Sequence, residues 1–107
     1  MTEIKLIEGG VCAAQGFTGA GIHCGVRKNR TKRDLALILS SVPASAAAVY
    51  TTNLVKGAPL EVTKKHLENG LARAVICNSG NANTCNADGI EIAEATCALL
   101  ASELGIA

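Results

Sequence analysis

The sequence predicts one α/β (α+β) domain over residues 1–107, with a sheet of about five strands and one well-defined helix and no internal boundary. Hydrophobic residues make up 49% of the chain, which indicates a globular rather than a disordered protein. Short apolar runs at residues 35–39 and 74–77 have strand length. Residues 88–105 instead repeat apolar side chains at helical spacing.

The N-terminal third is rich in glycine. Residues 4–7 alternate apolar and polar side chains and predict a short strand, with residues 11–14 continuing as extended chain. Residues 16–26 are interpreted as glycine-rich strands that pack closely against another layer. A phosphate loop is not favoured, because the run lacks a G-K-[ST] ending and no helical pattern follows it.

The middle of the chain predicts mainly strands. Asp34–Ser40 is almost continuously apolar and predicts a central strand buried on both faces. Residues 42–45 predict a turn and residues 46–52 a further strand. Residues 59–63 alternate like a strand that begins at a proline, and residues 64–71 predict a short helix closed by glycine.

The C-terminal third holds the clearest helix. A strand is predicted over residues 72–77, and Asp88 with Glu91 three residues later forms a capping-box pattern. Gly105 is placed to end the helix. One face is apolar and is expected to pack on the rest of the domain; it comprises Ile90, Ala93, Cys97, Leu100 or Ala101, and Leu104.

The aromatic content limits the core. Phe17 and Tyr50 are the two aromatic residues, so the core must be built from Ala, Val, Ile and Leu, which bury less area each. Ordering about 100 residues costs on the order of 100–200 kcal/mol of conformational entropy. We therefore expect some apolar faces to find partners outside this chain.

Charge and cysteine usage exclude several classes of partner. The net charge of +1 indicates neither nucleic acid nor an anionic membrane, and the basic run from Arg27 to Arg33 is interpreted as a solvated loop between strands. Five cysteines without a signal peptide favour free thiols in the cytoplasm. Cys77 and Cys97 are interpreted as small core residues. No metal or cofactor is expected, and no apolar run has membrane-spanning length.

The residues after the strand at 72–77 are the best candidates for a functional site. They pack three asparagines, one serine and one glycine into six positions. An ordinary polar turn explains each residue alone. Alternatively, the turn is a polar wall at the carboxyl end of a strand, where α/β proteins bind ligands. The candidate residues for substrate contact are Asn78, Ser79, Gly80, Asn81 and Asn83.

Several segments together resemble one family. Residues 43–53 read P-A-S-A-A-A-V-Y-T-T-N, residues 58–59 read A-P, and residues 74–83 read A-V-I-C-N-S-G-N-A-N. The strand from Asp34 and the helix from Gly89 match as well. In these motifs the chain resembles the ornithine acetyltransferase (glutamate N-acetyltransferase) family of arginine biosynthesis, over nearly its whole length.

The resemblance implies a layered sheet-and-helix fragment of a self-cleaving acetyltransferase fold. Members of the family cut themselves before a threonine, which becomes the N-terminus of a second chain and the nucleophile. That threonine takes acetyl from N-acetylornithine and passes it to glutamate, and some members also use acetyl-CoA. An N-terminal threonine suits this chemistry because its amine can activate its own hydroxyl.

The family's Thr-Gly oxyanion segment and its Ala-Thr-Met-Leu cleavage segment have no counterpart here. We therefore expect this chain to be the N-terminal part of the first chain, inactive and prone to self-association by itself, with the rest of its precursor and the second chain as partners. No residue is assigned as nucleophile. Thr96 resembles a cleavage threonine superficially, but it lies inside the predicted helix.

Two rival hypotheses come from other classes of protein. The first is a small cytosolic binding module that uses the turn at residues 78–83 as its ligand loop. The second is a thiol-based redox or metal protein, which predicts bound metal or a reversible disulfide.

Overall fold

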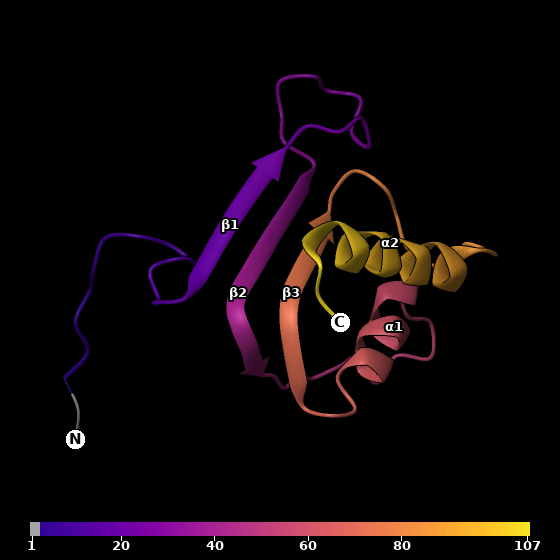
Figure 1. The fold of residues 1–107 in the computed structure, drawn as a ribbon. Helices are drawn as coiled ribbons and strands as arrows, with labels where there is room; N and C mark the ends of the chain where they lie inside the picture. Colours follow the sequence, from indigo (N-terminus) through magenta and orange to yellow (C-terminus); the bar gives the residue numbers. More distant parts are fainter. Residues whose placement is uncertain (1–2) are drawn as a thin grey trace.

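The computed structural model describes residues 3–107, so the first two residues of the predicted domain lie outside the described part. Three antiparallel strands form one sheet in the order β1-β2-β3: β1 (Phe17–Ile22), β2 (Leu35–Ser45) and β3 (Leu71–Asn78). Helices α1 (Ala58–His66) and α2 (Gly89–Leu104) contact each other and lie on the β3 side of the sheet, with β1 farthest from them (Figure 1). The predicted α+β class is confirmed.

The central strand was predicted correctly, but its burial and its length were not. β2 pairs with β1 from Phe17↔Ser40 to Ile22↔Leu35, and its partner on the other side is β3. Its apolar residues 35 and 37–39 are half-buried rather than buried. The predicted turn at residues 42–45 is wrong, because the strand continues past a register shift between Leu39 and Ala44. An irregular stretch of this kind accommodates a proline that has no N–H to donate.

The N-terminal prediction of strands fails before residue 17. Residues 4–7 form no strand, and Ile4 and Leu6 are 90% and 94% exposed. Residues 11–14 form a turn instead of extended chain, closed by the Ala13 N–H donating to the Gly10 carbonyl. Among residues 3–107 the structure therefore has three strands, whereas about five were predicted.

Helix α1 corrects two further predictions. Residues 46–52 form no strand, and the predicted strand at residues 59–63 is helical. Pro59 stands in the first turn of α1, where an N–H has no acceptor in any case and a fixed φ suits the helix. Glu61 in the first turn and basic residues in the last turn complement the helix dipole. The helix ends at His66, earlier than predicted.

Helix α2 confirms the strongest periodicity in the sequence. It ends at Gly105, whose φ of 65° is left-handed, and the Ile106 N–H donates to the Ala101 carbonyl, as in a glycine C-cap. The predicted apolar face is half-buried except for Ile90, which is 49% exposed. The predicted capping box is not formed, because the Asp88 side chain makes no capping hydrogen bond.

The core of the described residues is small, as the composition predicts. Val62 of α1 is the buried hydrophobic residue among residues 3–107. The radius of gyration is 15.6 Å, against about 13 Å for a compact chain of this length. Cys77 is exposed, so its assignment to the core is wrong, whereas Cys97 is half-buried and burial raises the pKa of its thiol. Among residues 3–107, no helix is long and apolar enough to cross a membrane.

Candidate functional site

The predicted polar turn lies at one end of the sheet, beside the long β1–β2 connection. Leu35, at the start of β2, pairs with Ile22 at the end of β1 and with Asn78 at the end of β3. Antiparallel pairing therefore brings residues 23–34 and residues 78–83 to the same end of the sheet (Figure 1). We call residues 78–83 the Asn-rich turn and residues 23–34 the β1–β2 loop.

A buried carboxylate organises the β1–β2 loop. The side chain of Asp34 is fully buried, and it accepts backbone N–H groups of Cys24 at 2.8 Å, Gly25 at 3.2 Å and Arg27 at 2.9 Å. These bonds, led by the Arg27 N–H, hold the pKa of Asp34 well below its usual range, although burial alone raises it. Asp34 is therefore ionised at neutral pH, and its charge is satisfied by the backbone of the loop.

The same residue joins both neighbouring strands through its backbone. The Asp34 N–H donates to the Ile22 carbonyl at 2.9 Å, and its carbonyl accepts the Ser79 N–H at 2.9 Å. His23 Nδ1 lies 3.2 Å from the Asp34 carboxylate and 3.0 Å from the Lys32 carbonyl. Asp34 thus stands at the point where the loop, the sheet and the Asn-rich turn meet.

Arg27 connects the loop to the turn through its side chain. Its Nη2 donates to the Ser79 hydroxyl, and its Nε is buried with no hydrogen-bond partner among the described residues. Gly80 has a φ of 97°, and a Cβ placed on it would lie 3.1 Å from the Arg27 Cβ and 3.2 Å from the Arg27 Cα. Glycine is therefore required at position 80 for both its backbone angle and its close approach.

This contact corrects the interpretation of the basic run as a solvated loop. Lys28, Arg30, Lys32 and Arg33 are exposed as expected, but Arg27 is half-buried against the turn. Neither Arg27 nor Asp34 was predicted from the sequence as a residue of the site. The signal available for Asp34 was an acidic residue directly before an apolar strand, a position that calls for a partner.

The asparagines form a chain of side-chain amides. Asn81 Nδ2 donates to Asn83 Oδ1 at 3.3 Å, and Asn83 Nδ2 donates to Asn78 Oδ1 at 3.3 Å. Asn83 is half-buried, whereas Asn78 and Asn81 are exposed. The structure thus brings these three side chains together on one side of the turn, while Ser79 and Gly80 contact Arg27. Carboxamides can donate to a carboxylate and accept from an ammonium group, which are the two polar ends of an amino acid.

The turn also contacts the N-terminus of α1, which in turn packs against the start of α2. The Ala58 N–H donates to the Asn83 carbonyl at 2.9 Å, and Gly57 pairs with Thr84 in an isolated bridge. A Cβ placed on Gly89, the first residue of α2, would lie 2.9 Å from the Ala58 Cβ. The Asn-rich turn is therefore held between the sheet end and the start of α1.

Two surface pockets differ in position and lining. One of about 240 Å³ lies at the sheet end beside the turn. Its lining residues are Gly21, Arg33, Asp34, Leu35, Ala36, Cys77, Asn78 and Ser79.

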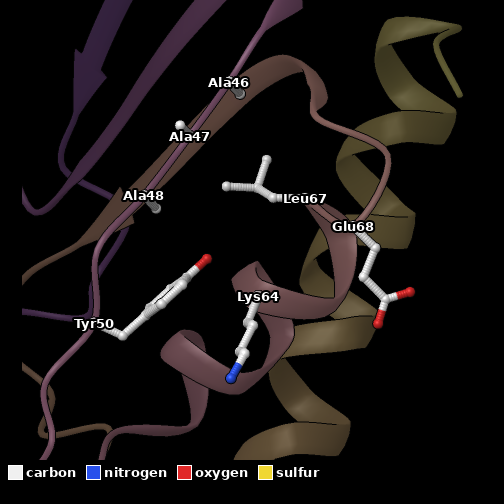
Figure 2. Close-up of a pocket in the computed structure, with 7 residues that line it drawn as sticks. All are labelled: Ala46, Ala47, Ala48, Tyr50, Lys64, Leu67 and Glu68. Atoms are coloured by element: carbon white, nitrogen blue, oxygen red, sulfur yellow. The ribbon is translucent and has the colours of Figure 1, made fainter.

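The second pocket, of about 390 Å³, lies between the segment after β2 and the C-terminal half of α1. Figure 2 shows the Tyr50 ring pointing toward α1 and the Glu68 carboxylate pointing away from Ala46, Ala47 and Ala48. Asn83 is bonded to the opposite end of α1. The larger pocket contains no residue of the Asn-rich turn, whereas Asn78 and Ser79 line the smaller one, so the smaller pocket is the better candidate for a ligand of the turn.

Other predicted features have clear positions. Thr96 lies inside α2 and its hydroxyl donates to the Ile92 carbonyl at 2.8 Å, as expected of an ordinary helix threonine. The five cysteines are free. Among residues 3–107, no three His, Cys, Asp or Glu side chains are grouped so that they could hold a metal ion.

The fold and the site define an α+β domain whose Asn-rich strand-end turn is hydrogen-bonded to the backbone of Asp34, a residue with a buried carboxylate. The model of the ArgJ family matches residues 18–107, and the chain belongs to that family. It is 46% identical over 105 residues to the arginine biosynthesis bifunctional protein ArgJ of Symbiobacterium thermophilum, covering 96% of this chain and 26% of that protein. A chloroplastic protein of the same name from Ostreococcus lucimarinus is 42% identical over 105 residues, covering 96% of this chain and 23% of that protein.

Solved structures give the same result. The crystal structure of the arginine biosynthesis bifunctional protein ArgJ from Bacillus halodurans has a TM-score of 0.86 and 42% identity, covering 92% of this chain and 52% of that one. Ornithine acetyltransferase from Mycobacterium tuberculosis, solved in complex with ornithine, has a TM-score of 0.70 and 42% identity, covering 78% of this chain and 44% of that one. The chain spans about a quarter of the length of the curated relatives it matches.

Proposed function

We propose that this chain is part of a glutamate N-acetyltransferase that moves acetyl from N-acetylornithine to glutamate in arginine biosynthesis. The observation that carries the proposal is the family match over residues 18–107 together with a TM-score of 0.86 to a solved family member. A relative solved with ornithine, at 42% identity, supports an amino acid as substrate.

In this proposal the nucleophile is a threonine carried by a second chain, released when the precursor cuts itself. The described residues supply scaffold and one wall of the substrate pocket rather than the reactive group. Exposed apolar side chains such as Leu54 at 95% and Leu99 at 65% support a role as half of a larger core. The intact masses of the gene product and of its mature chains test the cleavage directly.

The Asn-rich turn is assigned to the amino-acid pocket. Its amide chain offers donors and acceptors at the edge of the smaller pocket, where Asn78 and Ser79 contribute to the lining. Asn81 is the first choice for substrate contact because it is exposed and stands at the free end of the amide chain, where it donates to Asn83. Asn83 is the second choice, and Gly80 allows the backbone to approach closely.

The test is Asn81→Ala in the full-length enzyme. We expect acetyl transfer to fall about tenfold or more, the value of one hydrogen bond to a charged group, while the unfolding temperature changes little. Asn69→Ala is the matched control, because it removes an exposed amide at the opposite end of β3. Transfer kinetics equal to those of the parent enzyme, with normal maturation, would remove Asn81 from the site.

A further inference from the structure

We propose that Asp34 is a positioning residue that sets the conformation of the Asn-rich turn by holding Arg27 against it. What the turn does for the reaction rests on the function proposed above, but the coupling between Asp34 and the turn is a property of this chain alone. Neither residue belongs to the turn in sequence: Arg27 lies 52 positions before Ser79.

Two routes lead from Asp34 to the turn. The first is direct, since the Asp34 carbonyl accepts the Ser79 N–H at 2.9 Å. The second is indirect, because the Asp34 carboxylate accepts the Arg27 N–H at 2.9 Å, and the Arg27 guanidinium in turn donates to the Ser79 hydroxyl. Asp34 therefore holds the backbone of Ser79, and Arg27, which Asp34 binds, holds the Ser79 side chain.

Packing restricts the next position along the turn. Gly80 lies directly against the Cβ, Cα and N of Arg27, within 3.1–3.4 Å of where its own Cβ would be. Those atoms are two backbone atoms and the first side-chain atom of Arg27, so a rotation of the Arg27 side chain does not move them away from Gly80. A displacement of Arg27 toward the turn must consequently move Gly80 and the asparagines that follow, and a displacement away removes the surface on which Gly80 packs.

A carboxylate is required at position 34 because several donors converge there. Three backbone N–H groups donate to its two oxygens, and His23 Nδ1 lies 3.2 Å from one of them. An ionised carboxylate has about four acceptor sites, whereas an amide has a single acceptor oxygen and turns two further donors toward the loop. Asp34→Asn therefore keeps the size of the side chain but leaves N–H groups unpaired.

The experiment compares Asp34→Asn, Ser79→Ala and the double variant in the full-length protein. Amide hydrogen exchange is measured at residues 24–27 and 79–83. We expect Asp34→Asn to raise exchange about tenfold or more in both segments, the value of a hydrogen bond to a charged group. Asp88→Asn makes the same chemical change at an exposed residue whose side chain forms no capping bond, and it should leave both segments unchanged.

The double variant decides whether the two segments are coupled. If Arg27 transmits the effect, the double variant will raise the exchange rate of residues 80–83 by a smaller factor than the product of the factors measured for the two single variants. Faster exchange confined to residues 24–27, or strictly multiplicative effects at residues 80–83, overturns the proposal. If Asp34→Asn does not fold, Ser79→Ala alone must still raise exchange at residues 80–83, and its failure to do so overturns the proposal equally.

Kinetics then separate this inference from the proposed function. With the turn in the substrate pocket, Asp34→Asn raises KM for glutamate at temperatures where the variant is fully folded, and Asp88→Asn does not. Faster exchange in the turn with unchanged KM leaves the positioning role of Asp34 standing and removes the turn from the pocket.

Discussion

The sheet end and the helix pair are stabilised in different ways. At the sheet end, hydrogen bonds converge on Asp34 from the N–H groups of Cys24, Gly25, Arg27 and Ser79. The two helices instead share one buried hydrophobic residue, Val62, and an exposed cluster in which Lys65 and His66 donate to Glu94. The first arrangement is directional and centred on a buried carboxylate, whereas the second combines little apolar burial with solvent-exposed charges.

The difference indicates which part of the structure is held by contacts within this chain. Among the described residues, the Asn-rich turn is hydrogen-bonded to Arg27, Asp34 and Ala58. Helix α2, in contrast, leaves Ile92 at 56% and Leu99 at 65% exposed, and an apolar pocket borders α1 (Figure 2). We infer that the turn keeps its conformation through contacts within the chain, while the helices need further apolar contacts to be held as firmly.

Gly80→Ala should give the largest loss and would test the rigidity of the sheet end. A φ of 97° costs a non-glycine residue about 1–3 kcal/mol, and the new Cβ meets Arg27 at 3.1 Å. We expect a loss of about 2–4 kcal/mol in the free energy of unfolding, measured by denaturant titration of the full-length protein, with transfer activity abolished.

Gly70→Ala is the matched control for this change. Gly70 has a φ of 72° and lies directly before β3, at the end away from the turn, and no atom lies within 4 Å of the position that a Cβ would take. It therefore carries the backbone cost without the contact, and the difference between the two variants isolates the packing of the turn on Arg27. Equal losses would show that the turn is not pressed against the loop.

Val62→Ala addresses the helix pair and should have an intermediate effect. Val62 is 4% exposed, and the change removes two methyl groups from the contact of α1 with its surroundings. At about 0.8 kcal/mol per group, we expect a loss of about 1.5 kcal/mol in the free energy of unfolding. Thr63→Ala, at the adjacent exposed position, is the control and should be close to neutral. A loss above that of Gly80→Ala would reverse the ranking of the two regions.

The sequence predicted the fold where local preference and tertiary context agree. Periodicity at residues 88–105 and the glycine at 105 placed α2 correctly, and the apolar run at 72–77 placed β3. It failed at residues 59–63, where alternation favoured a strand but a proline in the first turn favoured a helix. It also failed at residues 42–45, because a proline within a strand is compatible with an irregular register that no local pattern reveals.

The candidate site was predicted only in its local part. The density of asparagine and glycine after a strand identified the Asn-rich turn, because these residues act through their own backbone conformations. Asp34 and Arg27 were missed, since their role depends on strand pairing that brings residues 27 and 79 together. Contacts between residues distant in sequence leave no local pattern, so the one signal for such a residue is a charged side chain at a position expected to be buried.

Glu94→Gln should have the smallest effect, because the side chains that it joins are exposed. The hydrogen bond from His66, and then the one from Lys65, lowers the pKa of Glu94 below its ordinary 4.5. The unfolded chain therefore binds more protons near that pH, so the contribution of Glu94 is present above pH 4.5 and is lost as the pH falls through the folded pKa. Solvent screening keeps such pairs weak, so the loss at pH 7 should be smaller than that of Val62→Ala.

Unfolding of the parent protein and of Glu94→Gln at pH 7 and at pH 3 measures this contribution, with Glu103→Gln as the control in the same helix. The difference between the parent and Glu94→Gln should narrow at pH 3, because protonation then removes the charge from the parent as well. A difference that persists at pH 3 would mean that Glu94 acts through packing rather than charge. A loss as large as that of Val62→Ala would mean that the helix pair, like the sheet end, is held by directional polar contacts, and the contrast between the two regions would disappear.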